Sequence, residues 1–337
     1  MKLILKIIGG VVLLLVLVIA GLTASQYFNA ATSEHPVGFQ QVTIRDPQDK
    51  PLDVGIWYPT DSKPDPTLMG LSMQSVATDG AVTGRDLPLI VISHGNNGLF
   101  ASHSDTALAL ASAGFIVAAV THTGDNASDT SYVGTPRWLI DRPRHIHLVI
   151  DYMLKQWPAR NRIDPARIGM FGVSAGGFTA LVSVGGVPDV ALLTAHCKSQ
   201  PEFACTLWKT LPSPVPASVW IHDPRIKAAV IAAPGYGFAF APNGLSQVTV
   251  PVQLWNGTED RSVPYATNEA VVRALLPTPP DYRAVPGASH FSFLTPCPGW
   301  LFPLICREPN GFDRKAFHHA LNLSMEAFFQ KHLPPAP

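Results

Sequence analysis

The five residues Gly172-Val173-Ser174-Ala175-Gly176 lie between a strand-type run at 167–171 and a helix-compatible segment at 177–182. A sharp strand-to-helix turn with this pattern exposes the serine hydroxyl. The flanking glycines have a steric reason, because side chains two positions from the serine would collide with the neighbouring strand and helix. The same pattern also arises by chance in Gly-rich turns, so the flanking elements support the prediction. Together they predict an α/β architecture with Ser174 as a reactive group.

The rest of the chain alternates between apolar runs of strand length and helical patterns. A polar turn joins the first two expected strands in a hairpin pattern, and the polar residues 59–86, with Pro and Gly, indicate a surface loop. Apolar strands that alternate with helices predict a mostly parallel sheet flanked by helices. The expected strands are 39–45, 52–58, 87–93, 115–120, 168–173, 227–233, 250–255 and 281–285, and the expected helices are 104–113, 137–156 and 316–329.

The N-terminus has the layout of a targeting segment. Lys2 and Lys6 precede an apolar run from Ile7 to Leu22, as in a signal peptide or a membrane anchor. We expect residues 1–26 to be one of the two, 27–36 a linker and 37–337 a catalytic domain. The chain would then be exported, to the periplasm or beyond, with possible membrane association through this segment. The sequence leaves cleavage open, and it also leaves the oligomeric state open. The net charge of 0 gives no indication of a nucleic-acid partner.

Residues 187–224 interrupt the alternation, with six prolines and two tryptophans. A structureless segment of this length inside a compact domain is usually functional, so we expect a lid over the site. A surface insertion without a role is the alternative.

Four cysteines, Cys197, Cys205, Cys297 and Cys306, are an even number, which in an exported chain indicates disulfides. Proximity in the sequence favours Cys197–Cys205 and Cys297–Cys306, although four cysteines allow three pairings. Their spacing does not resemble a zinc site, and we expect neither a metal nor another cofactor.

A serine nucleophile needs a base, and the base needs an acid that orients it. In this architecture the chain order is Ser, then Asp or Glu, then His, and these groups collect at the carboxyl ends of the strands. Among the histidines after Ser174, His290 is the one that directly follows an expected strand. Glu259 and Asp260 follow the strand at 250–255, and we expect Asp260 to be the acid, with Glu259 as the alternative.

The oxyanion of an acyl-transfer intermediate needs two backbone N–H donors. Ala175, which follows the serine, supplies one. Asn96 supplies the other, because the Gly95 turn after the strand at 87–93 aims its amide into the site. The possible pocket residues are His94, Asn97, His122 and Val173. A structural hydrogen-bonding role is the alternative for the two histidines.

These residues together resemble the α/β-hydrolase superfamily, and within it the bacterial dienelactone-hydrolase-like proteins related to platelet-activating-factor acetylhydrolases. The resemblance runs from about Leu87 to Leu333. It rests on the segments 89–95, 172–177, 223–230 and 287–291. It implies the same oxyanion role for Asn96. Two features depart from the family: true dienelactone hydrolases use a cysteine nucleophile, and many relatives have histidine where Val173 stands.

The sequence therefore predicts an exported serine esterase that acts on a small-molecule ester, which could be short-chain, lipid-like or a polyester. A serine peptidase or amidase would use the same triad. A catalytically silent binding protein with this fold is the third possibility.

Overall fold

The computed structural model describes residues 2–298, 304–308 and 311–335. Its strands form one ten-stranded sheet in the order β10-β9-β8-β7-β5-β6-β2-β1-β4-β3. The strands are β1 Val37–Ile44, β2 Leu52–Pro59, β3 Asp65–Met69, β4 Ser72–Thr78, β5 Leu87–Ser93, β6 Ile116–Thr121, β7 Ile163–Val173, β8 Ile226–Ala232, β9 Val252–Gly257 and β10 Asp281–Val285.

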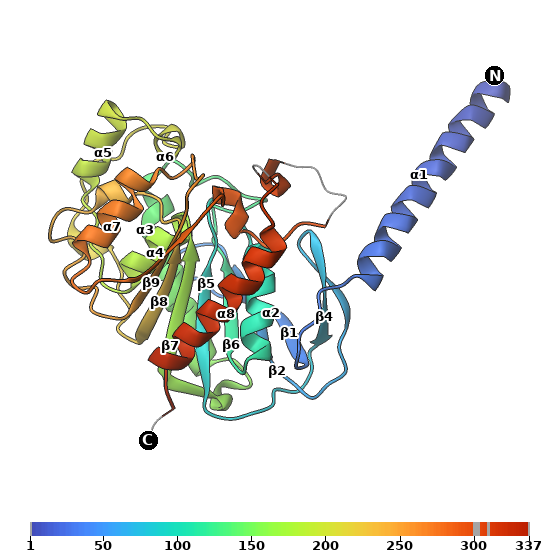
Figure 1. Cartoon of the computed structure of the whole chain (residues 1–337), viewed down its shortest axis with the longest axis horizontal. Helices are drawn as coiled ribbons and strands as arrows, with labels where there is room; N and C mark the ends of the chain where they lie inside the picture. The colour runs from blue at the N-terminus through green and yellow to red at the C-terminus, as the bar shows by residue number, and fades with distance from the viewer. Residues whose placement is uncertain (1, 299–303, 309–310, 336–337) are drawn as a thin grey trace.

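Helices flank the sheet (Figure 1). The helices are α1 Lys2–Phe28, α2 Ser104–Ser112, α3 Pro136–Lys155, α4 Ala175–Ser183, α5 Val190–Ser199, α6 Phe203–Thr206, α7 Glu269–Leu275 and α8 Arg314–His332. The strands and helices that we predicted are confirmed, with ends that differ by a few residues.

Strands β5 to β10 run parallel, whereas β2 runs antiparallel to both of its neighbours. Because the central strands are apolar on both faces, each face needs its own layer of helices. One hydrophobic cluster joins the sheet to α3 and α4, through side chains such as Ile146 and Phe178. A second cluster joins the sheet to α2 and α8, through Leu110 and Phe329. The predicted parallel sheet flanked by helices is confirmed.

Two local predictions are wrong. Residues 59–86 are not one surface loop, because β3 and β4 form an antiparallel hairpin that extends the sheet beside β1. The segment 187–224 is not structureless, since it contains α5, α6 and a short 3-10 turn, Ala217–Val219. The side chain of Asp189 accepts a hydrogen bond from the backbone N–H of Ala191 at 2.8 Å and thereby caps α5.

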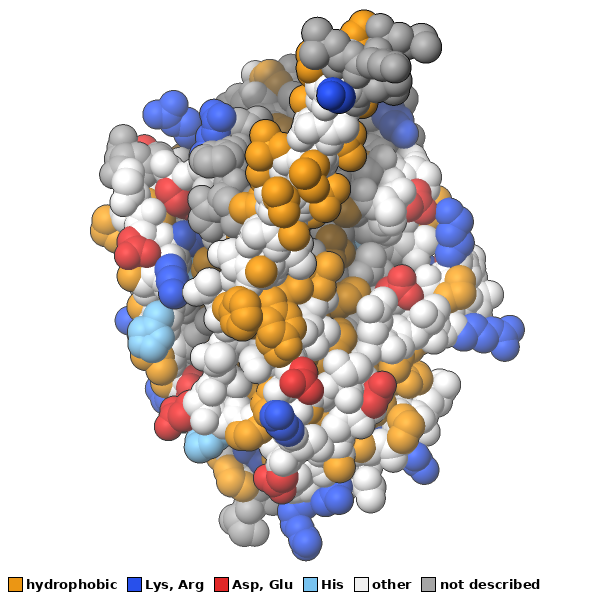
Figure 2. Space-filling view, turned by 90° about the vertical axis from the view of Figure 1, so that its right-hand side faces the viewer, with side chains coloured by type: hydrophobic (Ala, Val, Ile, Leu, Met, Phe, Trp, Pro, Cys, Tyr) orange, Lys and Arg blue, Asp and Glu red, His pale blue; other side chains and the backbone are white. Residues whose placement is uncertain are grey.

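The N-terminal helix α1 projects from the folded body (Figure 1). Its apolar part, Lys6–Phe28, has a mean hydropathy of 2.8 and is 0% buried. Apolar side chains are exposed along this helix (Figure 2). Its length and composition suit a membrane span, and a signal sequence has the same properties. It covers the described part of the predicted 1–26 segment and the first two residues of the predicted linker.

Candidate active site

Ser174 lies at the corner between β7 and α4, in a conformation that few side chains adopt. Its φ is 59° and its ψ is −121°, which places it among the strained backbone positions that concentrate at functional sites. A Cβ on Gly172 would overlap the carbonyl oxygen of Gly176, and a Cβ on Gly176 would overlap that of Ser93. The two glycines therefore allow the close strand-to-helix turn that exposes the Ser174 hydroxyl.

The structure brings Ser174, His290 and Asp260 together in one hydrogen-bonded chain. Ser174 Oγ lies 2.9 Å from His290 Nε2, and His290 Nδ1 lies 2.6 Å from Asp260 Oδ2. Since a carboxylate accepts hydrogen bonds, Nδ1 holds the ring proton and Nε2 is free to accept the proton of the serine hydroxyl. This arrangement has the geometry of a serine nucleophile, its base and an orienting acid.

The loop after β9 separates the two candidate acids. The side chain of Asp260 is 0% exposed, and its Oδ1 accepts hydrogen bonds from the backbone N–H groups of Ser262 at 2.9 Å and Val263 at 2.8 Å. Glu259 is exposed to solvent. Of the two carboxylates, Asp260 is the one hydrogen-bonded to His290.

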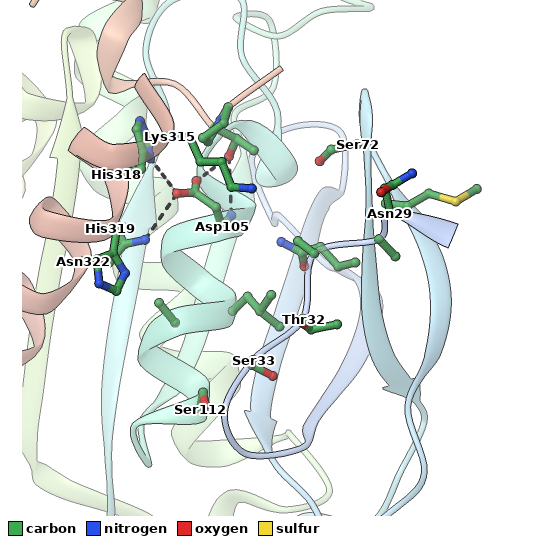
Figure 3. A pocket seen from close by; sticks show the side chains of 18 of the residues that line it. Asn29, Thr32, Ser33, Ser72, Asp105, Ser112, Lys315, His318, His319 and Asn322 are labelled. Carbon is green, nitrogen blue, oxygen red and sulfur yellow. Dashed lines mark hydrogen bonds and ion pairs between the residues drawn. The ribbon is translucent and has the colours of Figure 1, made fainter. Parts of the chain in front are cut away.

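A second Asp–His pair, Asp105 and His318, contacts the turn that contains His290. His318 on α8 is buried; its Nε2 donates to the carbonyl oxygen of Ser292 at 2.8 Å, and its Nδ1 lies 2.5 Å from Asp105 Oδ2 (Figure 3). Burial alone would raise the pKa of Asp105. The ion pair with His318, together with hydrogen bonds from His318, Thr295 and Asn322, instead holds the pKa of Asp105 well below its usual range. Sequence patterns missed this pair, because its members lie 213 residues apart.

The Gly95-Asn96 turn lies directly beside the nucleophile. A Cβ on Gly95 would be 3.3 Å from the Cβ of Ser174. The carbonyl oxygen of Gly95 accepts hydrogen bonds from His94 Nδ1 at 2.5 Å and from the backbone N–H of Gly98 at 3.3 Å. Because C=O and N–H point in opposite directions across a trans peptide, these bonds also set the direction of the Asn96 N–H.

His94 and His122, two of the possible pocket residues, are buried beneath this turn. His94 Nε2 accepts from the backbone N–H of His122 at 3.0 Å, and His122 Nε2 lies 2.9 Å from Ser93 Oγ. Burial, reinforced by the charge of Arg142, keeps the pKa of both rings well below the usual value. Both are therefore neutral at pH 7 and satisfied by internal hydrogen bonds, which favours their structural role.

The other two possible pocket residues differ from each other. Asn97 is exposed and has a φ of 58°, and its backbone N–H donates to Asp125 Oδ1 at 2.8 Å. Val173 is 2% exposed and belongs to the core. The structure therefore leaves Asn97, and not Val173, at the surface of the site.

A buried carboxyl, Glu269 at the start of α7, lies near the triad and was not found by sequence reasoning. Its side chain is 0% exposed, and neither of its oxygens meets full hydrogen-bond geometry with a described residue. Burial, reinforced by the charge of Asp260, raises its pKa to about 8, although its own backbone N–H and the nearby Asn256 side chain act in the opposite direction. Glu269 is therefore mostly protonated at neutral pH, and adds little negative charge beside Asp260.

The insertion 187–224 packs against the nucleophile side of the sheet. Trp208 makes ring contacts with Trp138 and Tyr236, at centroid distances of 5.5 and 6.5 Å. Tyr236 follows Gly235, whose backbone N–H donates to the Ser174 carbonyl oxygen at 3.2 Å. These contacts connect the insertion to the residues that support Ser174.

Two disulfides, Cys197–Cys205 and Cys297–Cys306, are present in the structure. The first closes a loop within the insertion, and the second closes a loop shortly after His290. They match the pairing that proximity favoured.

A cleft of about 1110 Å³ lies between the C-terminal end of α1 and helices α2 and α8 (Figure 3). Asp105, His318 and Lys315 line it, whereas Ser174, His290 and Asp260 do not.

Within the described ranges, no group of three or more His, Cys, Asp or Glu side chains has a geometry that could hold a metal ion.

The fold and this site define the class of protein. A solved structure, a ferulic acid esterase from Streptomyces cinnamoneus, matches with a TM-score of 0.63 at 20% sequence identity, covering 91% of this chain and 93% of that chain. The chain has the α/β-hydrolase fold, as predicted.

Two sequence comparisons show similarity to known proteins over a segment of the chain. Residues 67–153 match the family described as platelet-activating factor acetylhydrolase, isoform II. Over 85 residues the chain is 39% identical to the platelet-activating factor acetylhydrolase of Bos taurus, and the match covers 21% of this chain. The matched segment covers 19% of the length of this relative, about a fifth. In this segment the chain is similar to the platelet-activating factor acetylhydrolases, in agreement with the resemblance noted from the sequence. The matched segment contains Asn96 and ends before Ser174.

Proposed function

We propose that this chain is an exported serine hydrolase that cleaves carboxylic esters through an acyl-enzyme. The single observation that supports this most strongly is the hydrogen-bonded path from Ser174 Oγ through His290 to the buried carboxylate of Asp260. A serine with this backbone strain and these partners has little structural purpose other than nucleophilic chemistry.

In the first half-reaction, Ser174 Oγ attacks the ester carbonyl carbon while His290 Nε2 accepts the hydroxyl proton. Asp260 stabilises the resulting imidazolium through Nδ1. The carbonyl oxygen becomes an oxyanion, which accepts hydrogen bonds from the backbone N–H groups of Asn96 and Ala175. The intermediate then collapses, and His290 returns the proton to the departing alcohol.

In the second half-reaction, a water molecule takes the place of the alcohol. His290 removes one of its protons as the water oxygen attacks the acyl carbon of the ester on Ser174. Collapse of this second tetrahedral intermediate releases the carboxylic acid and returns the proton to Ser174 Oγ. The same two N–H donors serve both intermediates.

Short acyl esters are the first substrates to test, because the matched family is named for removal of an acetyl group. We propose that the insertion 187–224, packed through Trp208 beside Tyr236, forms the wall of the acyl site as a cap.

The decisive experiment compares the wild type with Ser174→Ala in hydrolysis of p-nitrophenyl acetate. We expect the variant to lose activity to the background rate, and to lose labelling by a fluorophosphonate probe. The matched control is Ser183→Ala, which alters another serine of the same helix region whose hydroxyl has no hydrogen-bond partner among the described residues. Undiminished hydrolysis by Ser174→Ala would refute the proposal, and absence of probe labelling in the wild type would favour a silent binding protein.

We also propose that α1 directs export and that the domain acts outside the cytoplasm. The two disulfides support an oxidising compartment. The intact mass of the exported protein tests whether α1 is removed: a mass that lacks residues 1–26 indicates a signal peptide, and the full mass indicates an anchor.

A further inference from the structure

The two proposed oxyanion donors come from separate parts of the chain. Asn96 follows β5, whereas Ala175 begins α4 after β7. An oxyanion hole works only when both N–H groups lie at hydrogen-bond distance from one developing charge. Some contact must therefore hold the β5 loop and the first turn of α4 at a constant separation.

Arg142, on α3, contacts both parts. Its guanidinium is 1% exposed. Its Nη2 donates to the carbonyl oxygen of His94 and, at 3.3 Å, to Ser93 Oγ. Its Nε donates to Thr179 Oγ1 at 3.0 Å. One rigid, planar group thus reaches the β5 loop with one nitrogen and α4 with another.

Each of these contacts reaches a backbone group close to one of the two proposed oxyanion donors. The Thr179 hydroxyl donates in turn to the carbonyl oxygen of Ala175 at 2.8 Å. The His94 carbonyl immediately precedes Gly95, whose peptide unit contains the Asn96 N–H. Arg142 therefore supports both donors through their neighbouring backbone groups.

Asp125 holds the guanidinium in this position. Its Oδ2 lies 2.5 Å from Arg142 Nη1 and accepts from Trp138 Nε1 at the same distance, 2.5 Å. Its Oδ1 accepts from the backbone N–H of Asn97 at 2.8 Å. The ion pair thereby contacts the β5 loop on both sides of Asn96, through His94 and through Asn97. Both side chains are 1% exposed, so solvent does not weaken the pair.

From these contacts we propose that Arg142 is a positioning residue that sets the separation of the Asn96 and Ala175 N–H groups, with Asp125 fixing its orientation. The proposal rests on the proposed esterase function. A buried ion pair that served stability alone would not need to donate hydrogen bonds both to the β5 loop and to α4.

The test uses full-length variants that avoid an unpaired buried charge. Removing one partner of a buried pair is strongly destabilising, whereas removing both charges is often tolerated. The main variant is therefore R142M/D125N, in which the introduced side-chain amide oxygen can still accept from the backbone N–H of Asn97. A second variant, R142K, keeps the charge but lacks the planar fork that reaches several acceptors.

The matched control is R144M/D46N. Arg144 lies on the same helix and forms a buried pair with Asp46, at 2.6 and 2.7 Å to the two carboxylate oxygens. Asp46 belongs to the turn between β1 and β2 and not to the β5 loop. The control therefore removes a buried ion pair of the same helix and leaves the direct contacts of Arg142 with Ser93, His94 and Thr179 in place. Two histidines separate Arg144 from Ser93, because its Nη2 lies 3.3 Å from His145 Nε2, His145 in turn contacts His122, and His122 contacts Ser93.

The readouts are kcat and KM for p-nitrophenyl acetate, and the inhibition constant of an alkylboronic acid. The boronic acid forms a tetrahedral adduct with Ser174 and places an oxyanion in the hole. At equal folded fraction, we expect R142M/D125N to lose about 100-fold or more in kcat, as when one oxyanion donor is lost. KM should stay within about threefold, and the boronate should bind more weakly by the same factor as kcat falls. We expect R142K to lose about tenfold in kcat and R144M/D46N to keep wild-type kcat.

Three results would overturn the proposal. The first is a kcat for R142K or for folded R142M/D125N within about twofold of the wild type. The second is an equal loss in R144M/D46N, which would indicate a general effect of losing a buried pair. The third is a shifted pH profile of kcat/KM with unchanged boronate affinity, which would mean that Arg142 acts through the charge of His290. Activity in Ser174→Ala would instead refute the esterase function itself, so the two failures are distinguishable.

Discussion

The buried carboxyl of Glu269 should make the stability of the protein depend on pH, and Glu269→Gln should remove this dependence. The pKa of Glu269 is raised by burial from 4.5 in the unfolded chain to about 8 in the folded protein. Between these two values the folded protein holds one proton more than the unfolded chain. The resulting stabilisation is fully present below pH 4.5 and is lost as the pH rises through 8.

The size of the effect follows from this window. Each pH unit inside it lowers the free energy of unfolding by about 1.4 kcal/mol. Glutamine is uncharged at every pH and has nearly the shape of the protonated acid. The free energy of unfolding of Glu269→Gln, measured relative to that of the wild type, should therefore rise by about 3.5 kcal/mol from pH 5 to pH 8.

The measurement is equilibrium urea unfolding at several pH values from 5 to 8, followed by tryptophan fluorescence with the disulfides intact. The matched control is Glu259→Gln, which makes the same change at an exposed carboxylate next to Asp260 in the sequence. If the difference between Glu269→Gln and the wild type were constant over this pH range within about 0.5 kcal/mol, Glu269 would not be a neutral buried acid, and the reasoning would fail.

Two further predictions concern the site. Asp260→Asn should lower kcat for p-nitrophenyl acetate by about 10⁴-fold, because asparagine would favour the wrong tautomer of His290, whereas Glu259→Gln should keep wild-type kcat; comparable losses in both would contradict the assignment. Gly176→Ala should lower the free energy of unfolding by about 3 kcal/mol or more, because its Cβ would overlap the Ser93 carbonyl oxygen, and a wild-type Tm in that variant would show that the turn can relax.

The groups of the proposed triad could be predicted because each follows a strand of a parallel sheet. Chain order and strand ends are local properties of a sequence, and they predicted which three side chains the structure joins by hydrogen bonds, Ser174, His290 and Asp260. The supporting pairs were not predictable in this way. Arg142 and Asp125 are separated by 17 residues and His318 and Asp105 by 213, and no pattern indicates which buried charges will meet.

The β3–β4 hairpin was missed because its polar residues appeared to belong on the surface. Gln74, in β4, is 1% exposed; its side-chain oxygen accepts a hydrogen bond from Trp57 Nε1 at 3.0 Å, whereas its Nε2 has no hydrogen-bond partner among the described residues. The bond to the oxygen offsets part of the cost of burying this polar side chain, and it depends on a distant strand. The helices of the insertion were more accessible to prediction, because Asp189 followed by an apolar run is a helix-start signal.

The order of the strands divides the sheet into two contiguous parts. Strands β1 to β6 form one part and strands β7 to β10 the other, and the two parts join where β5 pairs with β7. Asn96 follows β5 and Ser174 follows β7, so this seam passes through the reactive centre. Two complementary fragments divided between β6 and β7 would recover hydrolysis only by re-forming that strand pair. If Ser174 is the nucleophile that we propose, hydrolysis in the intact chain requires the β5–β7 pairing, and an assay of that activity would report on the joining of the two parts.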